Sequence, residues 1–299
     1  MAEPSFRCAA ASLGRDEPVA GTATNVRTWL LLEHTGPWGA TALRDARLPD
    51  GLGPRLQELA AEHTAKVLLI RRARARRDPE RLTVMAAYAD PVAPRLERGT
   101  VGDLREVLDL DLAGLRDGWG SGLERVDGSV FAVCTNGRHD ACCAERGRPV
   151  ALALDAAHPE PTWEVSHIGG DRFAANLVAL PHGLYYGRLD EESALRVAAA
   201  HLAGDVDLEH LRGRASYAMP VQAAEIVLRR RLGQRGIGDV RLLEVSRDGA
   251  LTSTRFRVGE ATYDVVVRTV PGPAEPLTCK AQAPSPVPRH EVVELFRSS

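Results

Sequence analysis

The stretch "CTNGRHDACCAERG", residues 134–147, holds three of the five cysteines in the chain. An apolar run, "SVFAVC", comes just before it and predicts a buried strand that ends at Cys134. The next residues are polar and include a glycine, so they predict a loop that can curl around a bound ion. Cys142 and Cys143 then open the following helix, where backbone amides favour thiolate over thiol. This stretch is therefore a candidate for metal or redox chemistry.

The second half of the chain predicts strands and helices in the order β-α-β-β-β-α. The helix expected over 141–157 contains Gly147 and Pro149, which predict that it is split. "TWEVSHI" predicts a strand, and "ANLVALPHGLYYGRL" predicts two strands around a Pro-His-Gly turn. "DEESALRVAAAHLAG" has the acidic first turn and terminal glycine of a helix. This order is that of a thioredoxin-like layer fold.

The first half shows a poorer version of the same pattern. "RTWLLLEH", "AKVLLIRR" and "LTVMAAYA" predict strands, and "LGPRLQELAAEH" predicts a helix between the first two. We therefore expect an α/β (α+β) protein with tandem thioredoxin-like domains over 1–124 and 125–214. Residues 215–299 predict a C-terminal α-β-β-β segment, and the Pro-rich stretch 272–290 within it predicts a surface excursion.

Composition narrows the classes of function. The formal net charge is −2, which does not suggest a nucleic-acid partner. The apolar runs are too short to span a bilayer, and the first residues lack the layout of a signal peptide, so we expect a cytoplasmic protein with no membrane partner. An odd number of cysteines argues against a disulfide framework. The sequence leaves the oligomeric state open.

A second motif, "EVSHIGGDRFAAN", occupies residues 164–176. His167 ends the predicted strand, and the Gly-Gly pair after it permits backbone angles closed to other residues. The chain can therefore fold back so that His167 and Asp171 point toward one centre. A purely structural interpretation is also open, in which Asp171 caps a short helix and His167 bonds within the core.

Together the two motifs offer thiolate, imidazole and carboxylate ligands from two loops that follow strands. Zinc accepts such ligands, but the Cys-x2-4-Cys spacing usual for zinc is absent. A [2Fe–2S] cluster can take two thiolates on one iron and nitrogen ligands on the other, and the Cys134-x8-Cys143 spacing fits a loop around a cluster better. His139 and His182 are spare ligand candidates. Cys8 and Cys279 are isolated in sequence and are expected to be structural or incidental.

Three stretches resemble the sucrase/ferredoxin-like family: "CTNGRHDACCAERGRPVA", "WEVSHIGGDRFAANLVALPHGLYYGRL" and "LRGRASYAMPVQAAE". The N-terminal "WLLLEHTGPWG" is similar to the opening segment of the family, so the resemblance covers most of the chain. It implies a thioredoxin-like [2Fe–2S] ferredoxin domain. Nothing here resembles a glycosidase site with its paired carboxylates.

The resemblance also implies ligands. Members with Cys-x8-Cys and His-x-Gly-Gly-His patterns hold the cluster with those four residues, which corresponds here to Cys134, Cys143 and His167. The fourth position is Asp171 instead of histidine. Asp171 binds iron, or Cys142 takes its place, or the fold is retained without a cluster.

The resulting interpretation is an electron-transfer protein with one [2Fe–2S] cluster, a carrier more than an enzyme, with a reductase and an unknown acceptor as redox partners. Two alternatives stay open. One is a thiol-redox enzyme that uses Cys134 and Cys143, in which the adjacent Cys142 and Cys143 form a strained disulfide or Cys134 attacks one of them in a dithiol exchange. The other is an interaction module that zinc stabilises.

Overall fold

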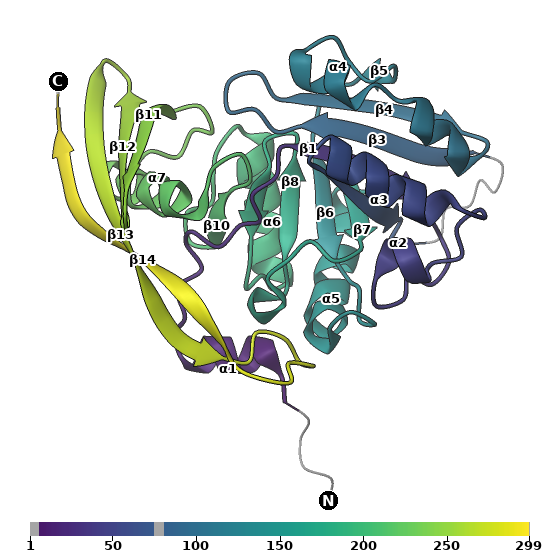
Figure 1. Cartoon of the computed structure of the whole chain (residues 1–299), viewed down its shortest axis with the longest axis horizontal. Helices are drawn as coiled ribbons and strands as arrows, with labels where there is room; N and C mark the ends of the chain where they lie inside the picture. Colours follow the sequence, from purple (N-terminus) through teal and green to yellow (C-terminus); the bar gives the residue numbers. More distant parts are fainter. Residues whose placement is uncertain (1–5, 75–80, 299) are drawn as a thin grey trace, which may run out of the picture.

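The computed structural model describes residues 6–74 and 81–298 and contains two β-sheets (Figure 1). Ten strands form a mixed sheet in the order β10-β9-β8-β6-β7-β2-β1-β3-β4-β5. Four strands form an antiparallel sheet in the order β11-β12-β13-β14. The predicted α/β class is thus confirmed. Within these described ranges, none of the helices has the length and apolar character that a membrane crossing requires.

The first half of the chain builds one side of the large sheet. Strands β1 and β2 are parallel and connected through α3, and β3 and β4 add on antiparallel beside β1. Every residue of β1 is buried, as its apolar run predicts, and α3 packs Leu52 and Leu56 against Leu30 and Leu32. The elements are α1 (Cys8–Gly14), β1 (Thr28–Glu33), α2 (Ala42–Asp45), α3 (Leu52–Glu62), β2 (Ala65–Arg71), β3 (Leu82–Tyr88), β4 (Arg95–Val101), the 3₁₀ helix η1 (Leu104–Asp109), α4 (Leu112–Asp117) and β5 (Glu124–Arg125).

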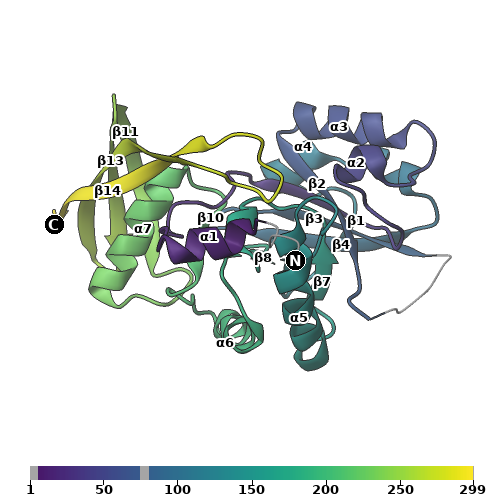
Figure 2. The same cartoon turned by 90° about the horizontal axis from the view of Figure 1, so that it is seen from below.

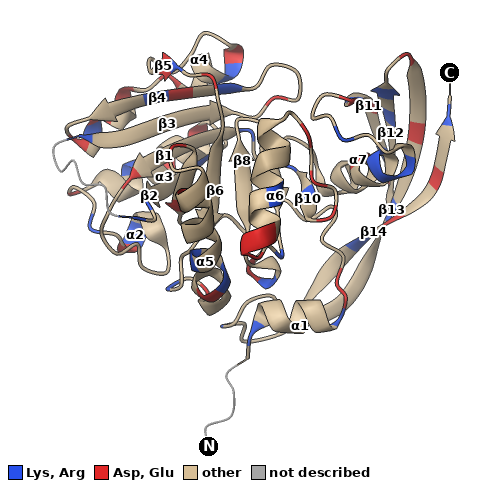
Figure 3. Cartoon of the chain, turned by 180° about the vertical axis from the view of Figure 1, so that it is seen from behind, with Lys and Arg blue, Asp and Glu red and all other residues tan. Residues whose placement is uncertain are grey.

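The second half builds the other side. Strands β6 and β7 are parallel and connected through α5, and β8, β9 and β10 continue the sheet antiparallel. Asp190 caps α6 by accepting from Ser193 N at 2.8 Å, and this helix begins with an acidic turn (Figure 3). The elements are β6 (Val130–Cys134), α5 (Ala141–Ala157), β7 (Thr162–Val165), the 3₁₀ helix η2 (Asp171–Phe173), β8 (Leu177–Leu180), β9 (Leu184–Tyr186), α6 (Glu191–Leu202) and β10 (Leu211–Arg214).

The two halves share one strand arrangement. The order β2-β1-β3-β4 in the first half corresponds to β7-β6-β8-β9 in the second, with the same parallel and antiparallel neighbours. A short antiparallel pairing of β2 with β7 joins the halves edge to edge. The repeated order supports the tandem thioredoxin-like assignment, which stays a prediction. The domain boundaries expected at 124/125 and 214/215 also stay predictions.

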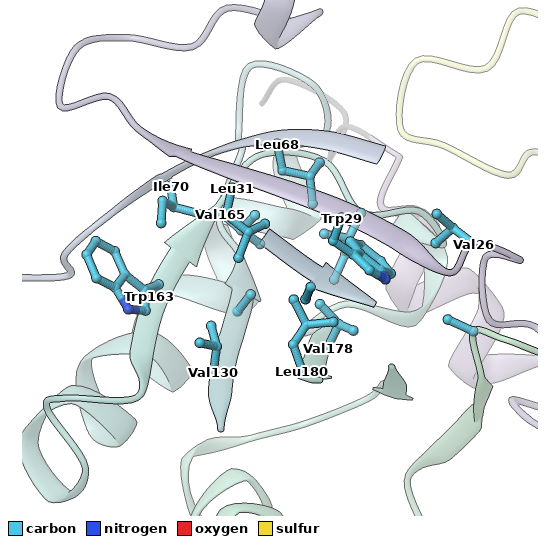
Figure 4. Close-up of a cluster of buried hydrophobic side chains, with 14 of the residues drawn as sticks. Val26, Trp29, Leu31, Leu68, Ile70, Val130, Trp163, Val165, Val178 and Leu180 are labelled. Atoms are coloured by element: carbon cyan, nitrogen blue, oxygen red, sulfur yellow. The ribbon is translucent and has the colours of Figure 1, made fainter. Parts of the chain in front are cut away.

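One large buried cluster contains residues of both halves (Figure 4). The rings of Trp29 on β1 and Tyr185 on β9 are 6.0 Å apart between centroids, although β8, β6, β7 and β2 separate these strands in the sheet. The sheet must therefore curl so that its inner face closes on itself. Trp29, Leu31, Val165 and Val178 contribute to this inner core, while α3, α5 and α6 cover outer faces.

The C-terminal segment corrects one prediction. The sequence predicts three strands after the helix, and the structure has four, because part of the Pro-rich stretch 272–290 is strand instead of loop. Beyond Arg268, β13 pairs only with β14, and the two form a two-stranded ribbon. Proline is tolerated there because both strands are edge strands, in which the missing N–H can be on the side that faces no neighbouring strand. The elements are α7 (Met219–Leu232), β11 (Val240–Asp248), β12 (Leu251–Val258), β13 (Ala261–Glu275) and β14 (Ser285–Arg297).

The helix after the cysteine loop corrects a second prediction. Helix α5 runs unbroken through Gly147 and Pro149, because Val150, Ala151 and Leu154 anchor its inner face in the core. Gly147 serves packing, since a Cβ there would lie 2.1 Å from the carbonyl oxygen of the last residue of β6. Helix α1 is an element that the sequence analysis did not identify.

Candidate metal centre

Two cysteines are brought together by a strand end and a helix start. Cys134 is the last residue of β6, and Cys143 is the third residue of α5. Asp140 fixes the start of α5 by accepting a hydrogen bond from Cys142 N at 2.9 Å. Cys134 and Cys143 are each 1% exposed, so both sulfur atoms lie in a dry environment.

The 167–171 loop brings the second pair of side chains to the same place. Gly169 and Gly170 have φ values of 106° and 82°, which side-chain-bearing residues rarely adopt. The loop folds back, and His167 Nδ1 lies 2.9 Å from Asp171 Oδ1. Gly170 precedes η2 as its N-cap, so Asp171 does not cap this helix and its carboxylate is left for the site.

The two pairs converge. The ligand atoms of Cys134, Cys143 and His167 all lie within 4.8 Å of one another. The thiol of Cys143 donates to Asp171 Oδ1 at 3.1 Å, which places a carboxylate oxygen against the same group. Asp171 also forms a second group with His139 and His167, so the two groups share His167, and each could hold a metal ion.

A second histidine joins this site. The His139 ring stacks on the His167 ring with centroids 3.7 Å apart, and His139 Nε2 lies 3.5 Å from Asp171 Oδ2. His139 Nδ1 lies 2.9 Å from the carbonyl oxygen of Ala40, which favours the proton on that nitrogen and leaves Nε2 toward the site. The sequence analysis treated His139 as a spare candidate. Its position in the loop between the two cysteines is the sequence feature that could have identified His139 as a site residue.

Charge is distributed unevenly over these side chains. The Cys143 thiol, with His167 adding to it, lowers the pKa of Cys134 to about 5 against the opposing effect of burial. Burial lowers the pKa of His167, but Asp171 and Cys134 outweigh it and raise that pKa to about 9. The pKa of Cys143 is raised by Cys134 and by burial. Burial raises the pKa of Asp171, but His139 and His167 overcome this and bring it below its usual range. A bound cation would replace the protons held here.

The 167–171 loop is held by two cations, the buried Arg212 and the half-buried Lys66. Arg212 is 1% exposed and donates to the carbonyl of Gly169 at 2.9 Å and to Asn176 Oδ1 at 2.8 Å. Lys66 Nζ donates to the carbonyl of Ile168 at 3.0 Å, and burial lowers its pKa to about 8. The sequence analysis missed both residues. Arg212 lies in one of its family-like stretches, whereas nothing near Lys66 in the sequence pointed to the site.

Two other candidates lie elsewhere. Cys142 points away from Cys143, as adjacent helical residues do, and its Sγ lies 3.4 Å from Cys279 Sγ. His182 Nδ1 lies 3.4 Å from His201 Nε2, in a separate histidine pair. All five cysteines are free thiols in this structure, so the vicinal Cys142–Cys143 pair is not a disulfide.

Fold and site together define a mixed α/β protein with a buried cysteine, histidine and aspartate group that could hold a metal ion. The chain belongs to the sucrase/ferredoxin-like family, because the model of that family matches residues 19–213, well over half of the chain. The match contains the whole candidate metal centre and ends before α7 and the four-stranded sheet. No curated protein and no solved structure matches the chain.

Proposed function

We propose that this protein is an electron carrier with one [2Fe–2S] cluster, held by Cys134, Cys143, His167 and Asp171. The observation that carries the proposal is the convergence of these four donors within the region that matches the family. Clusters of this type accept two thiolates on one iron and other donors on the second, and when bound the group supplies one-electron transfer.

The donor set fits such a group. His167 Nδ1 lies close to Asp171 Oδ1 without the alignment of a hydrogen bond, and in the described part of the chain it is a buried polar atom with no hydrogen-bond partner. The carboxylate of Asp171 stabilises a proton on this ring through the ion pair. A metal ion would replace that proton and the proton on the Cys143 thiol.

The surrounding residues define the electrostatics. Asp171 brings one more negative charge than a histidine would, which favours the oxidised state and lowers the reduction potential. The cations of Lys66 and Arg212 below the loop offset part of that charge. We expect a potential between those of all-cysteine plant-type clusters, about −400 mV, and Rieske centres, roughly −150 to +300 mV.

The exposed edge of the site favours contact with a redox partner. The side chains of His139 and His167 are 31% and 30% exposed, whereas both cysteines are buried. A reductase and an acceptor would dock at this edge, because electron transfer needs a short distance and no substrate pocket.

Anaerobic purification tests the proposal. We expect a red-brown protein that contains two irons per chain and bleaches with dithionite. Cys143→Ser should lose the colour, and the matched variant Cys142→Ser should keep it, because its sulfur points away from the site. Replacing Asp171 and His139 by alanine, one at a time, identifies the fourth ligand through the visible spectrum. A colourless wild-type protein without iron would refute the proposal.

One observation favours a second candidate. The lowered pKa of Cys134 beside the Cys143 thiol is typical of dithiol exchange. In that reaction the Cys134 thiolate and the Cys143 thiol would form a disulfide and pass two electrons and one proton to a disulfide of a partner protein, which would leave as one thiol and one thiolate. A colourless protein in which an oxidised partner causes Cys134 and Cys143 to form a disulfide with each other would support this function.

A colourless protein with one zinc ion at these ligands would instead support the zinc-stabilised module.

A further inference from the structure

A second group of cysteines lies outside the candidate metal centre. Cys8 is the first residue of α1, Cys142 is the second residue of α5, and Cys279 lies in the loop between β13 and β14. Figures 1 and 2 show α1 beside the tip of the β13–β14 ribbon. The four potential ligand atoms, including one from Asp140, lie within 4.8 Å of one another. Three segments that are far apart in the sequence therefore bring their cysteine sulfur atoms close together.

Asp140 contributes a buried carboxylate to this group. It is 0% exposed, and its oxygens accept from Cys142 N at 2.9 Å and Cys279 N at 2.6 Å. In the part of the chain that the structure describes, no lysine or arginine forms an ion pair with it. Each oxygen keeps a lone pair that a metal could use.

The distances match a tetrahedral zinc ion. Zinc binds thiolate at about 2.3 Å and carboxylate at about 2.0–2.2 Å, so a tetrahedron has sulfur–sulfur edges of about 3.8 Å and sulfur–oxygen edges of about 3.6 Å. Cys142 Sγ lies 3.4 Å and Cys8 Sγ 3.6 Å from Cys279 Sγ. Cys8 Sγ lies 3.6 and 3.7 Å from the two oxygens of Asp140. A disulfide, at about 2.05 Å, is not formed.

The geometry points to a structural zinc site with Cys8, Cys142, Cys279 and Asp140 as ligands. Such a set closes the coordination sphere and leaves no open position for substrate, as in structural zinc sites. Two of its four ligands, Cys8 and Cys279, fall outside the family match over residues 19–213. The inference does not depend on the proposed cluster.

The zinc ion would fasten three elements to one another. Helix α1 has only seven residues and would be marginal alone, and the distal part of the β13–β14 ribbon has only two strands. The head of α5, which also presents Cys143, is the third element. Zinc would therefore hold α1 and the β13–β14 loop against the helix that carries a ligand of the candidate metal centre.

Zinc analysis of the full-length protein tests this site separately from the cluster. We expect one zinc per chain in the wild type and in Cys134→Ser, and at least a tenfold loss in Cys8→Ser and Cys279→Ser. X-ray absorption at the zinc edge should show mainly sulfur neighbours. A strong chelator should lower the melting temperature of the wild type and leave that of Cys279→Ser unchanged. The chelator measurement tests the site even where a variant folds poorly, because the melting temperature of the wild type must fall if it holds zinc.

Four outcomes would overturn the inference. One is a wild-type protein supplied with zinc that retains none. A second is undiminished zinc in Cys279→Ser. The third is a Cys142–Cys279 disulfide in protein kept with zinc and without oxidant, shown by mass spectrometry after alkylation. Iron in place of zinc at these ligands would also contradict it, whereas loss of iron from Cys134→Ser bears only on the proposed cluster.

Discussion

Among single residues, Gly170 has the most direct effect on the position of Asp171. Its φ of 82° turns the chain, and a Cβ built there would lie 2.2 Å from Arg212 Nη2. Arg212 is itself fixed by hydrogen bonds to Gly169 and Asn176. The loop at Gly170 and the Arg212 side chain cannot move independently, so they are expected to shift together.

Gly170→Ala should therefore destabilise the fold and loosen the metal site. We expect a loss of about 1–3 kcal/mol from backbone strain, together with a lower metal content. Gly238→Ala is the matched control, because a Cβ there meets nothing within 4 Å and φ is not positive. Urea unfolding gives the difference. Equal stability of the two variants would contradict this role for Gly170.

The pKa shifts predict opposite pH effects for two ligands in the metal-free protein. Folding lowers the pKa of Cys134 from 9.0 to about 5, so its stabilisation is full above pH 9 and disappears as the pH falls through 5. Folding raises the pKa of His167 from 6.5 to about 9, so its stabilisation is full below pH 6.5 and is lost as the pH rises through 9.

Unfolding of two variants measures these effects. The stability difference between wild type and Cys134→Ser should shrink from pH 8 to pH 5, and that for His167→Gln should shrink from pH 6.5 to pH 9. Parallel curves for the two variants would show that the thiolate and imidazolium are not coupled as described.

The sequence predicted part of this site for a clear physical reason. Cys134 ends β6, and His167 follows the last residue of β7, Val165, by two positions. The two strands are parallel neighbours, so both side chains emerge at one edge of the sheet. His139, Lys66 and Arg212 could not be predicted in this way. They reach the site through tertiary contacts across the fold, which no local spacing encodes.

Among the elements, α5 connects the two cysteine groups. Its first turn directs Cys143 into the candidate metal centre and Cys142 toward Cys279. Asp140 caps the helix and also touches the Cys8 thiol, so one carboxylate serves both helix start and cysteine group. The sequence analysis missed the contact of Asp140 with this cysteine group, because it predicted neither α1 nor the strand β14 that begins within the Pro-rich stretch.

Substitutions of Asp140 separate these two roles. Asp140→Ala should cost about 1–2 kcal/mol through the lost cap and should also lose zinc, if the proposed site exists. Asp140→Asn keeps a capping oxygen but not the charge, so it should keep most of the stability and bind zinc more weakly. Asp190→Ala in α6 is the control, with a capping loss of about 1 kcal/mol and unchanged zinc. Full zinc binding by both Asp140 variants would contradict this account.

At the scale of the whole molecule, the curled sheet gives both halves one interior. Trp29 from the first half packs with Tyr185 from the second, inside a cluster that also contains Val165 and Val178. The sequence predicted β1 to β3 and β6 to β9, but not β4, β5, β10 or the curl of the sheet. The curl brings β1 against β9 and depends on the pairing of β2 with β7, which no local pattern encodes. The halves should therefore unfold together.

Trp29→Ala tests this shared core. We expect a loss of about 3–5 kcal/mol and a single unfolding transition that keeps its cooperativity. Trp119→Ala is the matched control, since Trp119 is 87% exposed and its loss should change stability by less than about 0.5 kcal/mol. Two separate transitions in calorimetry would show that the halves are independent.

The central claim is that Cys134, Cys143, His167 and Asp171 hold a two-iron cluster with unlike ligands on its irons. Mössbauer spectroscopy of protein enriched in ⁵⁷Fe tests it most directly. We expect two iron environments in equal amounts in the oxidised protein, one with sulfur ligands only and one with nitrogen and oxygen ligands as well, and both should vanish in Cys143→Ser. One iron environment, or an undiminished signal in that variant, would contradict the account.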